Sequence, residues 1–216
     1  MSAHPSSPPM TAVDMMRQAP VIPVLTIDVV EDAIPLAEAL VDGGLSVLEV
    51  TLRTPTALTA LAAMAKALPQ AYIGAGTIRT PAQAAQARDH GATFLVSPGT
   101  TPDLIRCFQT LPIPVLPGCS TASEAMTLAE AGFQGLKFFP AEAAGGVGFL
   151  KSLSAPLPDL FFCPTGGIDL QKAPHWLALP NVLCIGGSWV TPPQAVKNKD
   201  WASIRRLAAE AAALAR

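Results

Sequence analysis

Short apolar runs that alternate with helical segments constrain the fold of this chain more than any other feature of its sequence. The strand-like runs cover residues 21–26, 46–52, 72–75, 93–96, 113–116, 135–139, 160–163 and 182–185. Segments rich in Ala, Leu, Glu and Gln lie between them, such as residues 32–41, 55–68, 81–90 and 122–131, and have the spacing of helices. Strands that alternate with helices in this way predict the parallel sheet of an α/β protein.

Eight such units in 216 residues predict that the sheet closes into a (β/α)8 TIM barrel. We expect a single barrel domain over residues 10–216, because no linker interrupts the chain after residue 20. An open doubly wound sheet is the structural alternative. Residues 10–19 predict an additional N-terminal helix that Pro20 ends, and the Ser- and Pro-rich residues 1–9 predict a disordered tail.

The predicted helices carry start and stop signals. A threonine before a proline places an N-cap residue ahead of a first helical position, and this pair occurs at Thr54-Pro55, Thr80-Pro81 and Thr101-Pro102. Glycines that predict helix ends follow at Gly43-Gly44, Gly91 and Gly132. The weakest predicted helix lies between the sixth and seventh strands, where Gly145, Gly146 and Gly148 interrupt it.

The composition excludes several classes of protein. Hydrophobic residues make up 50% of the chain and charged residues 14%, which indicates a folded protein, and the net charge of −2 offers no basic surface for nucleic acid. The 4 cysteines form no C-x-x-C pair and the 3 histidines are scattered, so we expect neither a metal nor a cofactor. No signal peptide or membrane-spanning run is evident, which predicts a cytoplasmic protein.

Lys137 interrupts the apolar sixth run. In a strand the side chains alternate, so Leu136 and Phe138 point one way while Lys137 and Phe139 point the other. Loss of hydration among such neighbours favours a neutral amine, which is the form that attacks a carbonyl to give a Schiff base. The alternative is a lysine whose ammonium reaches water at the end of the strand.

The second strand predicts an acid and an arginine inside the barrel. Ser46, Leu48, Val50 and Leu52 share a face that suits packing against helices, which leaves Glu49 and Arg53 on the inner face. Buried charges are costly unless they are paired or functional. A Glu49–Arg53 ion pair along the strand is the structural alternative to a role in chemistry.

Double glycines follow the seventh and eighth strands, at Gly166-Gly167 and Gly186-Gly187. In barrels of this kind a phosphate site is often formed by these two loops, where glycines let backbone N–H groups approach the anion. Thr165 and Ser188 add hydroxyl groups beside them. An inward lysine, an inward acid and a phosphate cradle together predict a Schiff-base enzyme for a phosphorylated oxo compound.

The motifs at these strand ends resemble those of a known family, the 2-keto-3-deoxy-6-phosphogluconate (KDPG) and 4-hydroxy-2-oxoglutarate (KHG) aldolases. The matching segments are LEVTLRT at residues 48–54, GAGT at 74–77, SPG at 97–99, KFFPAE at 137–142, CPTGGI at 163–168 and IGGSW at 185–189. They run in order through nearly the whole predicted barrel. Cys119 stands where an aliphatic residue is expected.

The resemblance implies a class I aldolase that cleaves KDPG to pyruvate and glyceraldehyde 3-phosphate in the Entner–Doudoroff pathway, with KHG as a further substrate. It implies that Lys137 is the Schiff-base lysine and Glu49 the general acid and base. It places Arg53, Thr77 and Thr165 around the carboxylate and imine, with Pro98 and Phe139 shaping that pocket. The implied phosphate cradle consists of Gly166, Gly167, Gly186, Gly187 and Ser188. It also implies a homotrimer.

Three alternatives remain at this point. The same mechanism could act on the C4 epimer, 2-keto-3-deoxy-6-phosphogalactonate, because the stereochemistry of one carbon depends on contacts that a sequence does not reveal. A non-catalytic phosphosugar-binding barrel would use Lys137 and Glu49 only as an ion pair. A metal-dependent aldolase is disfavoured by the scattered histidines.

Overall fold

The computed structural model describes residues 10–215, so the tail predicted for residues 1–9 lies outside the described residues. The strands are β1 (Val21–Leu25), β2 (Val47–Thr51), β3 (Tyr72–Gly76), β4 (Leu95–Val96), β5 (Val115–Leu116), β6 (Gly118–Cys119), β7 (Gly135–Phe138), β8 (Phe161–Pro164) and β9 (Ile185–Gly187). The described strand pairs are parallel, which confirms the predicted α/β class with a parallel sheet.

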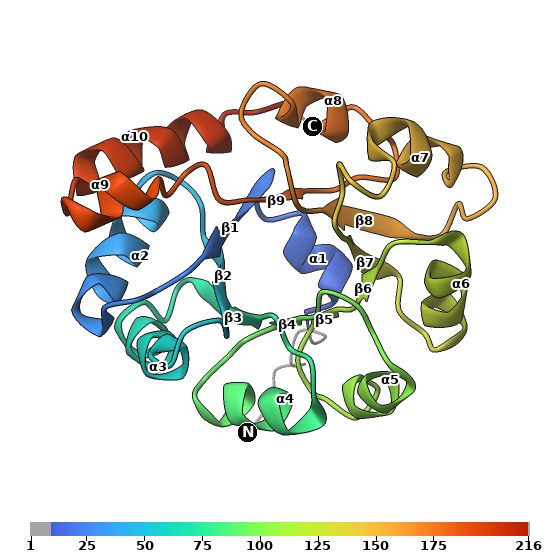
Figure 1. The fold of residues 1–216 in the computed structure, drawn as a ribbon, viewed down its shortest axis with the longest axis horizontal. Coiled ribbons are helices and arrows are strands. Elements are labelled where there is room, and N and C mark those ends of the chain that lie inside the picture. Colours follow the sequence, from blue (N-terminus) through green and yellow to red (C-terminus); the bar gives the residue numbers. More distant parts are fainter. Residues whose placement is uncertain (1–9, 216) are drawn as a thin grey trace, which may run out of the picture.

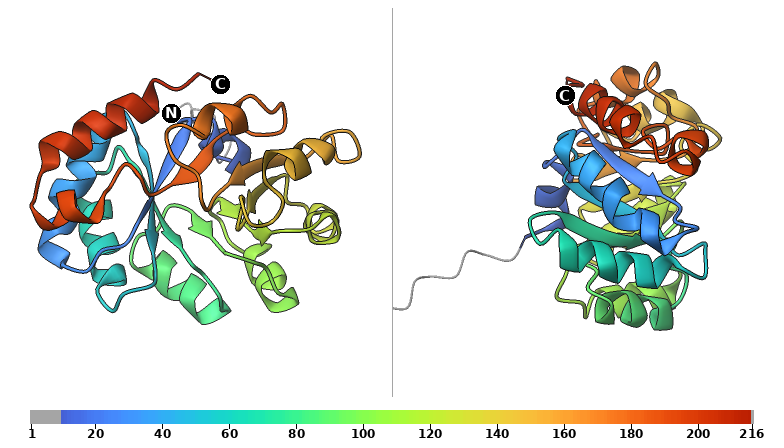
Figure 2. Two further views of the ribbon diagram at one scale, coloured as in Figure 1. Left: turned by 45° about the horizontal axis from the view of Figure 1, so that its top comes forward. Right: turned by 90° about the vertical axis from the view of Figure 1, so that its left-hand side faces the viewer.

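Helices lie between the strands along the chain. They are α1 (Ala12–Met16), α2 (Ala33–Asp42) after the 3-10 turn η1 (Val30–Asp32), α3 (Ala57–Ala67), α4 (Pro81–Asp89), α5 (Pro102–Phe108), α6 (Ala122–Glu130), α7 (Gly146–Ser152), α8 (Ala173–Leu177), α9 (Pro193–Lys197) and α10 (Trp201–Ala212). Most of them surround the strands in Figure 1. The last long helix, α10, packs beside α2 on the outside of the sheet (Figure 1 and Figure 2).

The parallel strands form a strongly curled sheet. Six strands pair in the order β5-β4-β3-β2-β1-β9, and three pair in the order β6-β7-β8. Single parallel bridges, Phe162 to Val182 and Thr165 to Gly186, link β8 to the segment that contains β9. In this arrangement the carboxyl ends of the strands meet on one face of the molecule.

Two groups of buried residues hold the strands in place. The larger lies between the strands and the surrounding helices; there the Phe138 ring stacks on Phe149 at 5.6 Å between centroids and lies 6.3 Å from Trp176. The smaller joins side chains of several strands to Met15 and Met16 of α1, which are 1% and 0% exposed. Helix α1 is seen inside the outline of the strands in Figure 1 and at one edge of the molecule in Figure 2, so its methionines cover one end of the space that the strands enclose.

The predicted helix starts hold at two of three positions. Thr80 and Thr101 cap α4 and α5 as expected, because each hydroxyl accepts a backbone N–H of the first turn. The start predicted at Thr54 is wrong: α3 begins at Ala57 with Thr56 at its N-cap. The Oγ1 atoms of Thr54 and Thr56 each donate to the carbonyl oxygen of Ile27 at 2.6 Å, and this contact with the end of β1 fixes the connection instead.

The sequence did not indicate β6, and Pro117 accounts for this. Proline lacks an N–H, so the ladder between β4 and β5 cannot continue through it. Its carbonyl oxygen still accepts the Lys137 N–H at 3.0 Å, and from Gly118 onward the chain pairs with β7.

Between residues 10 and 215, no helix is long and apolar enough to cross a membrane.

Candidate active site

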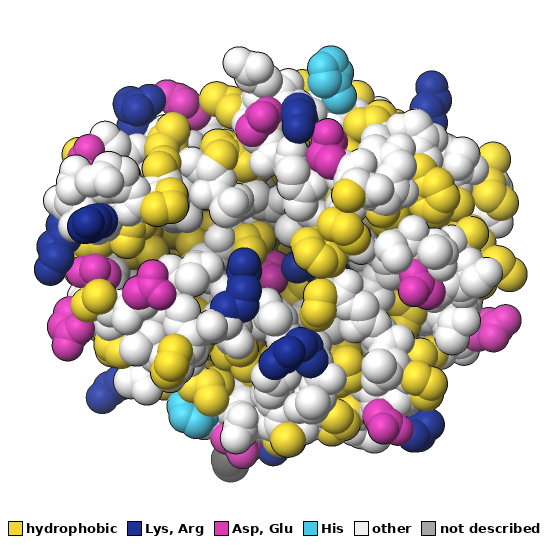
Figure 3. Space-filling model, viewed as in Figure 1, with side chains coloured by type: hydrophobic (Ala, Val, Ile, Leu, Met, Phe, Trp, Pro, Cys, Tyr) yellow, Lys and Arg dark blue, Asp and Glu magenta, His cyan; other side chains and the backbone are white. Residues whose placement is uncertain are grey.

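A cavity of about 890 Å³ opens at the carboxyl ends of the strands. Its lining includes every residue that the sequence assigned to the site: Lys137, Glu49, Arg53, Thr77, Pro98, Phe139, Thr165, Gly166, Gly167, Gly186, Gly187 and Ser188. Figure 3 shows a hollow in this face with charged side chains at its centre. Residues from widely separated parts of the chain therefore meet in one place.

Lys137 and Glu49 form an ion pair at the floor of the cavity. Lys137 Nζ donates to Glu49 Oε1 at 3.2 Å, and the two residues are 5% and 3% exposed. Lys137 does not reach out to water, because its side chain turns inward from β7 while Phe138 turns outward to the helices. The Phe139 ring lies 5.4 Å from Lys137 Nζ, a distance at which its π face attracts a cation.

Glu49 occupies its place because β3 leaves room for it. Glu49 is the central residue of β2, whose residues are all buried, and the neighbouring strand carries Gly76 beside the carboxylate. A Cβ atom at Gly76 would lie 2.0 Å from Glu49 Oε1, well inside a normal contact. Gly76 is thus a positioning residue for the acid, and the sequence pattern alone gave no reason to single it out.

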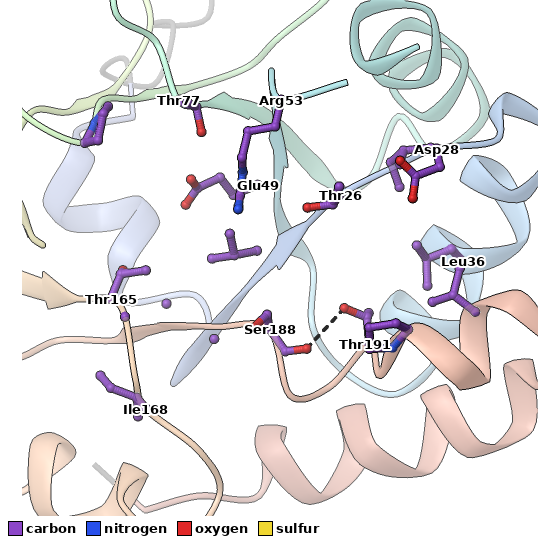
Figure 4. A pocket seen from close by; sticks show the side chains of 18 of the residues that line it. Thr26, Asp28, Leu36, Glu49, Arg53, Thr77, Thr165, Ile168, Ser188 and Thr191 are labelled. Carbon is purple, nitrogen blue, oxygen red and sulfur yellow. Dashed lines mark hydrogen bonds between the residues drawn. The ribbon is translucent and has the colours of Figure 1, made fainter. Parts of the chain in front are cut away.

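Arg53 lies at the mouth of the cavity rather than on the inner face of β2. The strand ends at Thr51, and Arg53 follows in a turn with an exposed side chain. In Figure 4 its side chain points into the cavity on the same side as Glu49. Within residues 10–215 its guanidinium has no ion-pair partner, so the alternative of a Glu49–Arg53 ion pair is wrong. The cation remains available to an anionic ligand.

The remaining predicted wall residues come from different strand ends. Thr77 follows β3 with a left-handed φ of 62°, a rare conformation for a β-branched residue. Thr165 follows β8 and is 6% exposed. Pro98 lies two residues after β4 and Phe139 directly after β7, and both are half-buried. Figure 4 shows Thr77, Thr165, Arg53 and Glu49 converging on one centre.

The loop after β8 has two backbone N–H groups that face away from Glu142 and Lys172. The carbonyl oxygen of Gly166 accepts the Glu142 N–H at 3.2 Å, and that of Gly167 accepts Lys172 Nζ at 2.8 Å. In a trans peptide the C=O and the following N–H point in opposite directions, so the N–H groups of Gly167 and Ile168 face away from these partners. In the described part of the chain neither N–H has a hydrogen-bond partner, and both residues line the cavity. Successive N–H groups of this kind form an anion site.

The loop after β9 completes the opposite wall. A Cβ at Gly186 would lie 2.2 Å from Thr165 Oγ1, so only glycine lets the two loops approach this closely. Beyond it, the Ser188 carbonyl oxygen accepts both the backbone N–H and the hydroxyl of Thr191, at 3.1 and 3.3 Å (Figure 4).

The sequence patterns did not predict one part of the cavity lining. Its outer wall is formed by the chain after β1, by α2 and by the segment from the end of β9 to the end of α9, with residues that include Thr26, Asp28, Leu36, Thr191 and Lys197. The rule that active sites gather at strand ends applies equally to the first strand. Extending that rule to residues 26–28 would have indicated this wall.

Two further features of the described residues are the buried Cys119 thiol and the spacing of possible metal ligands. Burial, aided by the negative charge of Glu124, raises the pKa of the Cys119 thiol to about 12, so this thiol is not a nucleophile at neutral pH. Among the described residues, no three His, Cys, Asp or Glu side chains come together as metal ligands would.

Comparison with known proteins relates this geometry to a family. The sequence profile of the KDPG and KHG aldolases matches residues 13–207. The chain belongs to the KDPG and KHG aldolase family. The resemblance inferred from the strand-end motifs is therefore confirmed.

Individual members of the KDPG and KHG aldolase family match over most of their length. The 2-dehydro-3-deoxy-phosphogluconate aldolase of Pseudomonas aeruginosa is 45% identical over 197 residues, which cover 91% of this chain and 90% of the relative. The KHG/KDPG aldolase of Escherichia coli K12 is 46% identical over 201 residues, covering 93% and 94%. A crystal structure of KDPG aldolase from Legionella pneumophila, with pyruvate captured as a covalent carbinolamine, superposes with a TM-score of 0.93 at 45% identity and covers 94% of this chain and 99% of that one.

Proposed function

We propose that this protein is a class I aldolase, a lyase that cleaves KDPG to pyruvate and glyceraldehyde 3-phosphate through a Schiff base on Lys137. The observation that carries the proposal is the buried contact of 3.2 Å between Lys137 Nζ and Glu49 Oε1 on the floor of the cavity. The family relationship and the carbinolamine seen in the Legionella aldolase support the same chemistry.

The reaction begins with proton transfer from Lys137 to Glu49, which leaves a neutral amine beside a carboxylic acid. The amine attacks the C2 ketone, and Glu49 returns the proton to the carbinolamine oxygen so that water leaves and a protonated imine forms. The imine then serves as the electron sink for cleavage. Glu49 fits both proton transfers because its carboxylate already lies within hydrogen-bond distance of the nitrogen.

Cleavage follows from the same two groups. Glu49 removes the C4 hydroxyl proton, the C3–C4 bond breaks, and its electron pair moves into the enamine. Glyceraldehyde 3-phosphate departs, a proton adds at C3, and water hydrolyses the imine to release pyruvate and free Lys137. Acid–base assistance of this kind contributes about 10²–10⁴-fold to such rates.

The rest of the lining binds the substrate. Arg53 is assigned to the carboxylate of the pyruvyl portion, since its guanidinium is a free cation that pairs with planar carboxylates. Thr77 and Thr165 supply hydroxyl groups around the imine, while Pro98 and Phe139 form the wall beside it. We assign the phosphate to the loops that contain Gly166, Gly167, Gly186, Gly187 and Ser188.

The wider organisation is part of the proposal. Residues 10–216 form one domain, a closed (β/α)8 barrel with an additional N-terminal helix, and the bridges between β8 and β9 and the single residue between β5 and β6 support closure. The resemblance to the family supports a homotrimer in the cytoplasm, a place in the Entner–Doudoroff pathway and activity on KHG.

Borohydride reduction in the presence of pyruvate, followed by peptide mass mapping, tests the mechanism. We expect a reduced pyruvyl adduct on Lys137, no adduct in Lys137→Ala, and a slowed reaction with some remaining imine in Glu49→Gln. An adduct on another lysine would move the site. Failure to trap an adduct while pyruvate binds would reject the imine and favour a binding protein, and rates on both C4 epimers would identify the preferred substrate.

A further inference from the structure

Three side chains meet behind the loop that follows β8, on the side away from the cavity. Trp176 Nε1 donates to Glu142 Oε1 at 3.0 Å, and Lys172 Nζ lies 3.2 Å from Glu142 Oε2. The same Lys172 Nζ donates to the carbonyl oxygen of Gly167 at 2.8 Å. We call Glu142, Lys172 and Trp176 the loop brace. Among the described residues, none of the three lines the cavity, so the loop brace does not touch the ligand.

Burial fixes one end of the loop brace. Trp176 is fully buried, and the indole N–H donates to Glu142. A buried N–H that loses its acceptor is costly, which holds the Glu142 carboxylate over the indole even though its side chain is 36% exposed. Lys172 is 45% exposed and links this anchored carboxylate to the loop. An isolated surface ion pair stabilises little, but this one is attached to a buried group.

The other end of the loop brace sets the direction of a peptide group. Lys172 draws the Gly167 carbonyl outward, and the N–H of Ile168 consequently turns toward the cavity. The backbone N–H of Glu142 acts in the same way on Gly166 and thereby orients the N–H of Gly167. Gly167 has a left-handed φ of 79°, and a Cβ there would lie 2.7 Å from Glu142 Cγ, so the loop rests directly on the loop brace.

We propose that Glu142 and Lys172 are positioning residues that aim the loop N–H groups at the substrate phosphate, and so set the preference for phosphorylated substrates. This proposal rests on the proposed function, because it assumes that the loop after β8 binds the phosphate of the substrate. It adds a role for two residues that do not line the cavity. Chemistry at Lys137 lies at the other end of the substrate. Loss of the loop brace therefore weakens phosphate binding and leaves the formation of the pyruvyl enamine intact.

The test compares two reactions of the same enzyme. Cleavage of KDPG requires the phosphate site, whereas exchange of the pyruvate methyl protons with deuterium requires only the imine and enamine. In Lys172→Met we expect the KM for KDPG to rise about fivefold, the effect of one lost hydrogen bond of ordinary net strength at a solvent-accessible lysine, with kcat and pyruvate exchange within about twofold of wild type. Glu142→Gln, which keeps an acceptor for Trp176 but loses the charge, should raise KM less.

Two further variants separate positioning from general stability. Lys172→Arg retains a cation that can donate to both the Gly167 carbonyl and Glu142, so it should restore most of the affinity. Lys66→Met makes the same change as Lys172→Met at an exposed lysine on α3 and should leave both reactions unchanged.

The possible outcomes distinguish the positioning role of the loop brace from the proposed aldolase function. An unchanged KM for KDPG in Lys172→Met would overturn the positioning role of the loop brace, while the aldolase assignment would stand. A loss of pyruvate exchange in proportion to cleavage would also overturn it, because the variant would then disturb the whole site. If the wild-type protein exchanged no pyruvate protons, the proposed function would fail, and the loop brace with it.

Discussion

Replacing Gly76 by alanine should displace the acid of the proposed aldolase with one methyl group. The new Cβ would lie 2.0 Å from Glu49 Oε1 and 2.6 Å from both Cγ and Cδ of the same side chain. Ordinary contacts begin near 3.4 Å, so the carboxylate must move by more than about 1 Å. A shift of that size away from Lys137 breaks a hydrogen bond that is 3.2 Å long.

The expected effect is large in both activity and stability. Misplacing a catalytic group by about 1 Å lowers the rate about 10²-fold. The displaced carboxylate and Lys137 are 4% and 7% exposed as side chains, and separating such a buried pair should cost about 3 kcal/mol of unfolding free energy. The rate of KDPG cleavage per folded molecule and the urea midpoint measure the two effects separately.

Gly74→Ala is the matched control on the same strand. Its Cβ would face the same side of β3 but would meet the Phe94 ring at 2.4 Å instead of Glu49. Overpacking there should cost about 1–3 kcal/mol while the activity of the folded fraction stays near wild type. If Gly76→Ala kept full activity per folded molecule, or if both variants lost activity equally, the assignment of Gly76 as the residue that makes room for Glu49 would be refuted.

Glu124, Cys119 and Thr77 can each be tested by a single measurement. The N–H of Ser120 donates to Glu124 and holds the pKa of that carboxyl below its ordinary value of 4.5, so this contact adds stability above that pH and loses it as the pH falls through the folded-state pKa. Urea unfolding of Glu124→Gln should differ from wild type at pH 7 and converge with it in acid; a difference that grew in acid would contradict the sign. With a pKa of about 12, native Cys119 should resist iodoacetamide at pH 8 while the more exposed Cys107 reacts, and equal labelling rates by mass spectrometry would contradict this. Thr77→Gly should relieve a left-handed backbone and maintain or raise the thermal midpoint while lowering activity through the lost hydroxyl; a lower midpoint would show that the φ of 62° is not strained.

The parts of the site that depend on local rules could be read from the sequence. Alternation along β7 placed Lys137 inward and Phe138 outward, and both orientations follow from a period of two that needs no knowledge of the rest of the fold. The rule that parallel strands end on a common face then brought residues as distant as Glu49 and Ser188 to one cavity.

The parts that depend on contacts across the fold could not be read in the same way. Glu49 pairs with Lys137, which lies 88 residues away, rather than with Arg53 on its own segment. This pairing depends on where β2 ends. Arg53 lies beyond Thr51, the last residue of the strand, so its side chain does not follow the alternation of inward and outward side chains. Thr54 failed as a helix cap for a similar reason, because its hydroxyl donates to the carbonyl oxygen of Ile27 in the segment that follows β1.

The Lys137–Glu49 pair also explains how a charged site can sit on an apolar floor. Two opposite charges at 3.2 Å offset part of each other's cost of burial before substrate arrives. Met15 and Met16 of α1 pack against apolar side chains of several strands in the space that the strands enclose. In the proposed reaction, Glu49 keeps its place beside the Lys137 nitrogen when the imine forms, because Gly76 leaves room for its carboxylate and the surrounding core resists movement. In the proposed mechanism, the pair that offsets the cost of burying Lys137 in the resting protein is therefore the same pair that moves protons once the lysine reacts.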